Sequence, residues 1–107
     1  MPRWLPKVLT QIRELAAANQ VLFTLKARRE LANLEFGLDE EDACDVLANL
    51  AAEDSAGRLQ SAATGEWMYL FKPVIAGMAL YIKLILRRHC IVVSFHEDEG
   101  SDNEEDT

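Results

Sequence analysis

The sequence has few cysteines and no long apolar run, and both shortages exclude classes of protein. Its two cysteines, Cys44 and Cys90, lie far apart and match no Cys-x-x-Cys or Cys/His ligand spacing. This pattern argues against a disulfide framework and against a structural zinc site. No stretch reaches the roughly 18 apolar residues of a membrane span, because Lys83 interrupts the longest candidate. We therefore expect a cytoplasmic protein with no membrane partner and no bound metal.

The chain has 107 residues and a formal net charge of -7, but the negative charge is concentrated at one end. Seven of the 18 acidic residues lie in the last 11 positions, so residues 1–96 hold 18 - 7 = 11 acids against 11 bases. A chain of this length buries only roughly 60 to 65% of its unfolded surface, which disfavours deep cavities and large cofactors. We predict one folded domain over residues 1–96 and a disordered acidic tail over residues 97–107.

The first half of the chain has the spacing of helices. Apolar residues recur every three or four positions from Pro6 to about Ala18, which predicts an amphipathic helix. A short extended piece over residues 20–23 follows, after which Thr24 can cap a second helix that Gly37 ends. Asp39 and the acidic residues after it favour the start of a third helix, because the helix dipole is positive there.

In the second half the hydrophobic period changes from 3.6 to 2, which is typical of strands. Three runs rich in β-branched and aromatic residues predict antiparallel strands over residues 67–72, 78–87 and 90–96. We expect the polar stretch before them to be a connection, and we expect turns between the strands. The predicted fold class is α+β, with N-terminal helices packed on one face of a small antiparallel sheet.

Alternation along the last two predicted strands separates a core face from an outer face. Tyr81 and Lys83 alternate with apolar residues that must face the helices, and His96 alternates with Val93 and Phe95, which we expect in the core. Residues 58–96 hold five bases against one acid, and these bases are Arg58, Lys72, Lys83, Arg87 and Arg88. Cations that pair with phosphates and an aromatic ring that can stack on a base suit a phosphodiester ligand, whereas the simpler alternative is a polar sheet face in water.

Short matches to a known family run through the chain in order: Ala18–Val21, Gly37–Asp39, Cys44–Val46, Trp67, Pro73, Tyr81–Lys83 and Val93–Phe95. Over about residues 8–96 this series resembles the motility quorum-sensing regulator (MqsR) toxins. That family has the RelE-like ribonuclease fold, which packs helices on one face of a small antiparallel sheet and uses the other face for RNA. The resemblance implies the toxin of a type II toxin-antitoxin system, with an antitoxin as its partner.

The resemblance also implies an activity and a set of residues. The activity is that of a metal-independent endoribonuclease, in which the RNA 2′-hydroxyl attacks the adjacent phosphate. Tyr81 matches the family's active-site tyrosine, and His96 stands where the family has a lysine after Val-Ser-Phe. Met68 replaces the family's glutamine, and Arg58 is the base nearest to a family lysine that has no exact counterpart. The candidate catalytic residues are His96, Tyr81 and Lys83, and the candidate phosphate-binding residues are Arg58, Lys72, Arg87 and Arg88.

We expect His96 to transfer protons, because an imidazole titrates close to neutral pH. The expected partners are a messenger RNA substrate and the cognate antitoxin, with DNA bound only through the antitoxin complex. Two other functions stay open. A non-catalytic module could dock an acidic partner protein on the basic sheet face, which Met68 favours. A structural role without nucleic acid is favoured by the net charge of -7.

Overall fold

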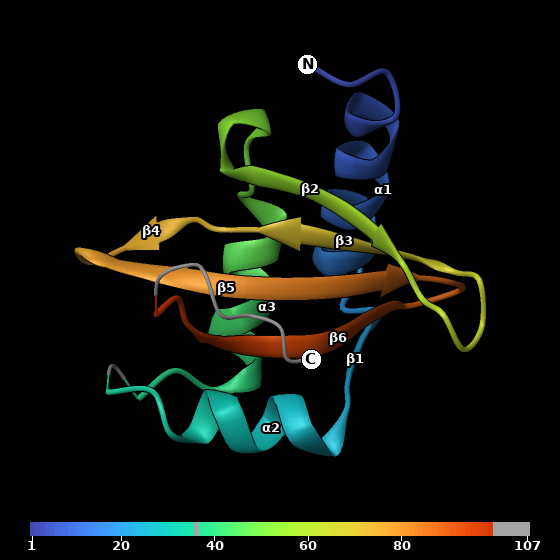
Figure 1. Cartoon of the computed structure of the whole chain (residues 1–107). Coiled ribbons are helices and arrows are strands. Elements are labelled where there is room, and N and C mark those ends of the chain that lie inside the picture. Colours follow the sequence, from blue (N-terminus) through green and yellow to red (C-terminus); the bar gives the residue numbers. More distant parts are fainter. Residues whose placement is uncertain (36, 100–107) are drawn as a thin grey trace.

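The computed structural model describes residues 1–35 and 37–99 and confirms the predicted α+β class. The elements follow one another as α1 (Leu5–Ala17), β1 (Val21–Phe23), α2 (Leu25–Ala32), α3 (Glu40–Ala48), the 3₁₀ turn η1 (Ala52–Asp54), β2 (Ser55–Gln60), β3 (Trp67–Phe71), β4 (Val74–Ile75), β5 (Met78–Leu86) and β6 (Cys90–Glu97). Figure 1 shows the strands in front of α1 and α3. In the part of the chain that the structure describes, no helix is long and apolar enough to cross a membrane.

The sheet is mixed, whereas the sequence predicted an antiparallel one. Its strand order is β1-β6-β5-β3-β2, and β4 pairs with β5 beside this path. The long strands β2, β3, β5 and β6 pair antiparallel as neighbours, but β1 runs parallel to β6. The extended piece after the first helix was predicted, but its place in the sheet depends on a partner about 70 residues away, which local sequence does not indicate.

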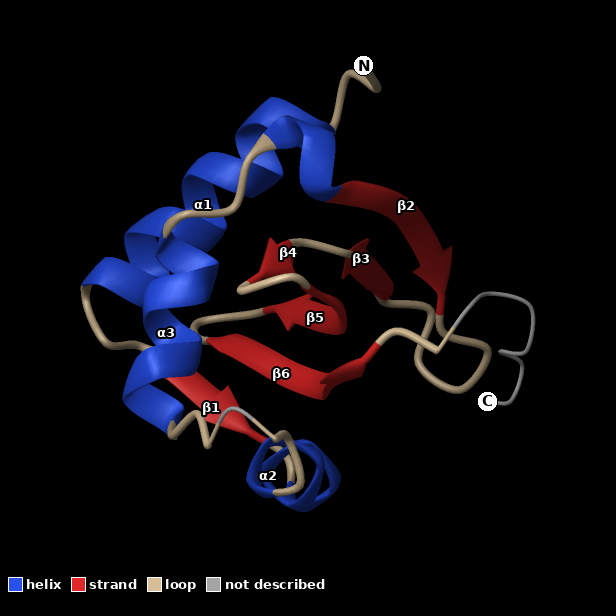
Figure 2. Ribbon diagram, turned by 90° about the vertical axis from the view of Figure 1, so that its left-hand side faces the viewer, coloured by secondary structure: helices blue, strands red, loops and turns tan. Residues whose placement is uncertain are grey.

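Two helices cover one face of the sheet and the third lies along its edge. Figure 2 shows α1 and α3 on one side, no helix on the other side, and α2 below β1 and β6. We call the helix-free side the outer face. The core between α1, α3 and the sheet is apolar, and its largest fully buried side chains include Ile12, Leu47, Phe71, Ile82 and Phe95.

The helix starts agree with the predicted caps. The hydroxyl of Thr24 accepts a hydrogen bond from the N–H of Ala27 at 3.0 Å. Asp39 accepts from the N–H of Asp42 at 2.8 Å, and the Asp42 carboxylate accepts from the N–H of Asp39 at 3.1 Å. These reciprocal bonds form a capping box that satisfies N–H groups left over at a helix start.

The end of α2 was predicted too late. The helix ends at Ala32 rather than just before Gly37, because Leu34 leaves the helical path to become buried in the core at 8% exposure. Gly37 does adopt the left-handed conformation expected of it, with φ 73°, but it does so in the loop after the helix.

The strand β2 was missed entirely. The sequence prediction placed a connection here, but residues 55–60 pair with β3. Gly57 has φ 99° at an irregularity in this pairing, and small residues such as Ser55 and Ala56 have little intrinsic strand preference. The predicted turn after β3 contains the short strand β4, and a two-residue turn of Ala76 and Gly77, both with positive φ, joins it to β5.

The sheet continues beyond the predicted end of the folded domain. Glu97 belongs to β6, and the N–H of Asp98 donates to the carbonyl of Ala79 at 2.8 Å. The predicted disordered tail therefore begins too early, at a residue that is part of the sheet. Residues 100–107 of the predicted tail lie outside the described residues.

Candidate active site

Tyr81 of β5 and His96 of β6 form a stacked pair on the outer face. The two residues lie directly opposite each other in the antiparallel ladder. Their ring centroids are 5.1 Å apart and the ring planes differ by 10°. Burial alternates strictly along the centre of β5, with Leu80 and Ile82 fully buried, so Tyr81 between them must point to the outer face. The prediction that Tyr81 and His96 share one face of the sheet is therefore confirmed.

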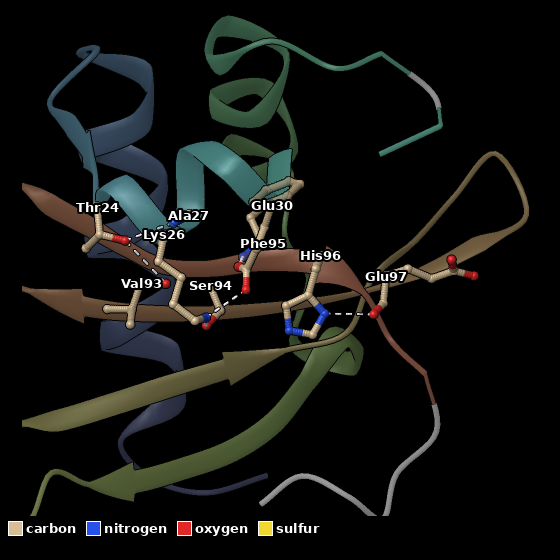
Figure 3. Close-up of polar contacts among 9 residues, drawn as sticks. All are labelled: Thr24, Lys26, Ala27, Glu30, Val93, Ser94, Phe95, His96 and Glu97. Atoms are coloured by element: carbon tan, nitrogen blue, oxygen red, sulfur yellow. Dashed lines mark hydrogen bonds and ion pairs between the residues drawn. The ribbon is translucent and has the colours of Figure 1, made fainter. Parts of the chain in front are cut away.

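The His96 ring is held in one orientation by the main chain. Its Nδ1 lies 2.8 Å from the carbonyl oxygen of Glu97 (Figure 3). A carbonyl oxygen only accepts hydrogen bonds, so Nδ1 carries the proton in this contact. In the neutral ring the lone pair then belongs to Nε2, and in the imidazolium Nε2 carries the second proton. Nε2 is thus the atom of His96 that can accept or donate a proton at the site.

An irregularity in β6 changes which residues face outward in the part of the strand before His96. Lys83 pairs with Ser94 and Leu84 pairs with Val92, so Val93 is an extra residue on β6. The extra residue reverses the alternation: Val92 is fully buried and Val93 is only half-buried. The sequence prediction had Val93 in the core and Val92 outside, which is wrong, because a bulge shifts the alternation by one residue. Beyond the bulge the prediction is correct again.

Lys72 and Asp98 complete a cluster around the stacked rings. The Lys72 Nζ lies 5.8 Å from the centroid of the Tyr81 ring and 3.5 Å from a carboxylate oxygen of Asp98. Lys72 follows β3 directly, and Asp98 follows β6, so three segments contribute to this group. We call Lys72, Tyr81, His96 and Asp98 the outer-face cluster. It combines a cation, an aromatic ring, an imidazole and a carboxylate.

Lys83 lies on the same face, one step along β5 from the cluster. It is two residues from Tyr81, and its partners across the sheet are Leu70 on β3 and Ser94 on β6. Side chains two residues apart on a strand share a face and lie about 6.6 Å apart. Lys83 therefore adds a second cation to the outer face, beside the cluster.

Helix α2 lies against the edge of β6 beside the cluster, and this contact was not predicted from the sequence. The N–H of Phe95 donates to a carboxylate oxygen of Glu30 at 2.9 Å. The other carboxylate oxygen of Glu30 accepts from Lys26 at 2.7 Å, and Lys26 also donates to the hydroxyl of Ser94 at 2.9 Å (Figure 3). The pair of Lys26 and Glu30 is a local i,i+4 pair on α2, but no local pattern signals the contacts of Glu30 with Phe95 and of Lys26 with Ser94, because these join positions more than 60 residues apart.

Arg58 is not part of the outer face. It pairs across the sheet with Tyr69, which in turn pairs with Leu84, a residue buried in the core. Directly opposite residues share a face, so Arg58 points to the helix side. There its guanidinium lies 3.8 Å from the centroid of the Trp67 ring and 4.9 Å from that of Trp4. The structure does not bring Arg58 together with Tyr81 and His96.

Arg87 and Arg88 lie at the opposite end of β5 from the cluster. Arg87 comes six positions after Tyr81, which corresponds to about 20 Å along a strand. Arg87 forms a two-point ion pair with Glu66, with nitrogen-oxygen distances of 2.8 and 2.6 Å. The Arg87 guanidinium lowers the pKa of the Glu66 carboxyl. Both arginines are exposed, but Arg87 is already paired with a carboxylate.

The far half of the outer face is apolar rather than basic. Ile85 pairs with Ile91, and Met68 pairs with Leu59, whose side chain is 50% exposed. Sequence alternation predicted a basic and polar face, with Ile85 as an apolar residue on it. The difference arises because β2 adds Leu59 to the sheet, while the bulge in β6 turns Ile91 outward.

Neither cysteine is placed for chemistry. Both Cys44 and Cys90 are buried. Burial raises the pKa of the Cys90 thiol to about 12 and also raises that of Cys44, so both are thiols rather than reactive thiolates at neutral pH. Among the described residues no three or more His, Cys, Asp or Glu side chains are grouped so that they could hold a metal ion.

The chain matches a known protein family. The family described as "Motility quorum-sensing regulator, toxin of MqsA" matches residues 6–97, which is most of the chain. The matched range includes Lys72, Tyr81, Lys83 and His96, while Asp98 lies just beyond it. No curated protein matches the chain.

Proposed function

The chain belongs to the family of motility quorum-sensing regulator toxins, so it is the toxin of a toxin-antitoxin system, and on this premise we propose that it is a metal-independent endoribonuclease that cleaves messenger RNA. The observation that carries the proposal is the outer-face cluster. A histidine with an oriented ring, an aromatic ring and a cation lie together on a sheet face that none of the described helices covers. Such a face is open to an extended strand of RNA.

The proposed reaction needs a base, an acid and positive charge. The base removes the proton of the RNA 2′-hydroxyl, whose oxygen attacks the adjacent phosphorus. The bond from phosphorus to the 5′ oxygen breaks, and the acid protonates that oxygen, which leaves a 2′,3′-cyclic phosphate and a 5′-hydroxyl. His96 supplies proton transfer through Nε2, and Lys72 and Lys83 stabilise the charged phosphate. Tyr81 orients the nucleotide, and its ring stacks on His96.

The remaining basic residues have lesser roles in this proposal. Arg88 lies about 20 Å or more from the cluster along β5 and would contact RNA only at the periphery. Arg87 could do so after exchanging Glu66 for a phosphate. Arg58 stabilises the packing of Trp4 and Trp67 rather than the substrate. Messenger RNA as the substrate places the activity in the cytoplasm, and contact with DNA is expected only through the antitoxin complex.

The apolar half of the outer face favours a second function, a protein-binding module without catalysis. Apolar side chains on an open sheet face mark a contact with protein better than a contact with phosphates. A family toxin has an antitoxin partner, and these apolar residues would suit it. The two functions are separable, because only the first one predicts turnover.

The proposed function is tested by incubating the purified chain with messenger RNA in excess EDTA. We expect cleavage by catalytic amounts of protein, because His96, Tyr81 and the lysines supply the chemistry without a metal. Activity lost on chelation and restored by a divalent cation would contradict the metal-independent mechanism. Intact RNA with folded protein would favour the binding module.

A further inference from the structure

We propose that Asp98 is the general base of the reaction and that His96 is its general acid. The inference rests on the proposed endoribonuclease function and assigns the second proton-transfer group of the same site. Asp98 lies outside the range that the family match covers, and its acidic surroundings in the sequence suggested a solvated tail. Its contacts in the structure place it instead in the outer-face cluster.

The position of Asp98 follows from the sheet. Leu80 pairs with Glu97, and the N–H of Asp98 donates to Ala79 at 2.8 Å, so the ladder between the two strands continues through residue 98. Asp98 is two residues from His96 and therefore projects from the same face, about 6.6 Å away. Its side chain is only 20% exposed, and the Lys72 ammonium is 3.5 Å from its carboxylate.

This spacing suits an in-line displacement at phosphorus. The attacking 2′ oxygen and the leaving 5′ oxygen lie on opposite sides of the phosphorus atom, so the base and the acid must also be separated. A carboxylate is ionised at neutral pH and can accept a proton at once, whereas an imidazolium can donate one. The different chemistry of the two groups therefore assigns the base to Asp98 and the acid to Nε2 of His96.

In the proposed step the protein accepts one proton and donates one. The Asp98 carboxylate takes the 2′-hydroxyl proton as the bond from the 2′ oxygen to phosphorus forms. The bond from phosphorus to the 5′ oxygen breaks, and that oxygen takes the Nε2 proton of His96. Asp98 is then protonated and His96 is neutral, and exchange with water restores both. Lys72 lies beside the carboxylate and beside the Tyr81 ring, where it can stabilise the negative phosphate.

The experiment is rescue of a cleavage defect by a small carboxylate. We expect Asp98→Ala to lower the single-turnover cleavage rate by roughly 10²-fold or more. Added formate should restore a measurable part of the rate, while chloride at the same ionic strength should not. Asp98→Asn keeps the shape of the side chain and should be equally slow. The control is Glu97→Gln, which removes the carboxylate of the neighbouring residue, an exposed side chain. This variant should cleave RNA at the wild-type rate.

The outcomes separate this inference from the proposed function. A wild-type chain that does not cleave RNA would overturn the proposed function and the inference with it. A wild-type chain that cleaves, together with an Asp98→Ala variant that cleaves equally fast or faster, would overturn the inference alone. Slow cleavage without formate rescue, in a variant whose thermal unfolding matches wild type, would make Asp98 a positioning residue for Lys72 and also overturn the base assignment.

Discussion

His96 contacts the rest of the protein through its face and one ring nitrogen, and neither contact belongs to the core. The ring stacks on Tyr81 and its Nδ1 donates to the Glu97 carbonyl. We therefore expect His96→Ala to fold normally. Its single-turnover cleavage rate should fall roughly 10²-fold or more, while RNA affinity changes much less, because proton transfer acts mainly in the transition state. Full activity in this variant would move proton transfer to another group.

Lys83 should give a different result, because its proposed role is to neutralise phosphate. We expect Lys83→Ala to weaken RNA binding and cleavage together. The slope of log affinity against log salt should become shallower by about 0.7, the value for one phosphate contact with a single strand. Lys7→Ala is the matched control, since Lys7 is an exposed lysine on α1, away from the outer face. An unchanged slope in Lys83→Ala would show that Lys83 does not contact phosphate.

At the scale of elements, α2 protects the edge of β6 next to the cluster. Glu30 accepts the N–H of Phe95, a fully buried residue, at 2.9 Å. Glu30→Ala leaves that N–H without its acceptor and should lower the free energy of unfolding by about 1–3 kcal/mol. Urea unfolding measures the change, and Glu14→Ala on the exposed side of α1 should cost less than about 0.5 kcal/mol. Equal stabilities of the two variants would show that the edge contact contributes little.

The elements also show which parts of the structure the sequence predicts. Helix starts at Thr24 and Asp39 depend on bonds within three residues, so local sequence is sufficient. The strand β2 exists because β3 pairs with it, and its residues carry no strand signal of their own. The sequence prediction assigned Arg58 to the phosphate-binding residues. The pairing of β2 with β3, which was not predicted, places Arg58 on the helix side of the sheet instead.

The site was also predicted only in part, because local sequence places some of its residues and long-range contacts place the others. Tyr81 and Lys83 lie on a regular strand, where alternation is enough to place them. His96 was placed correctly although the bulge at Val93 made the alternation before it wrong. Asp98 was missed because a carboxylate in an acidic segment looks solvated, and only the three-segment contact with Lys72 shows otherwise.

At the scale of the whole molecule, charge is divided between a neutral body and an acidic end. Truncation after Asp98 removes five acids and leaves the core, whose last member is Phe95, complete. The melting temperature should stay nearly the same. RNA affinity should rise at ~0.01 M ionic strength, because the acids compete with phosphate for the basic residues of the sheet face. The gain should shrink at ~0.15 M, because salt screens this competition. Equal RNA affinities of the truncated and full-length chains at low salt would contradict this competition. A full-length variant in which these five acids are changed to amides separates the effect of charge from the effect of chain length.

The central claim is that the chain cleaves RNA by attack of its 2′-hydroxyl, with side chains and no metal ion. The most direct measurement is mass analysis of the ends produced from a defined RNA by the purified chain in excess EDTA. The account predicts a 2′,3′-cyclic phosphate on one fragment and a 5′-hydroxyl on the other, and no cleavage of the same RNA carrying 2′-O-methyl groups. A 3′-hydroxyl with a 5′-phosphate, or cleavage of the methylated RNA, would contradict it.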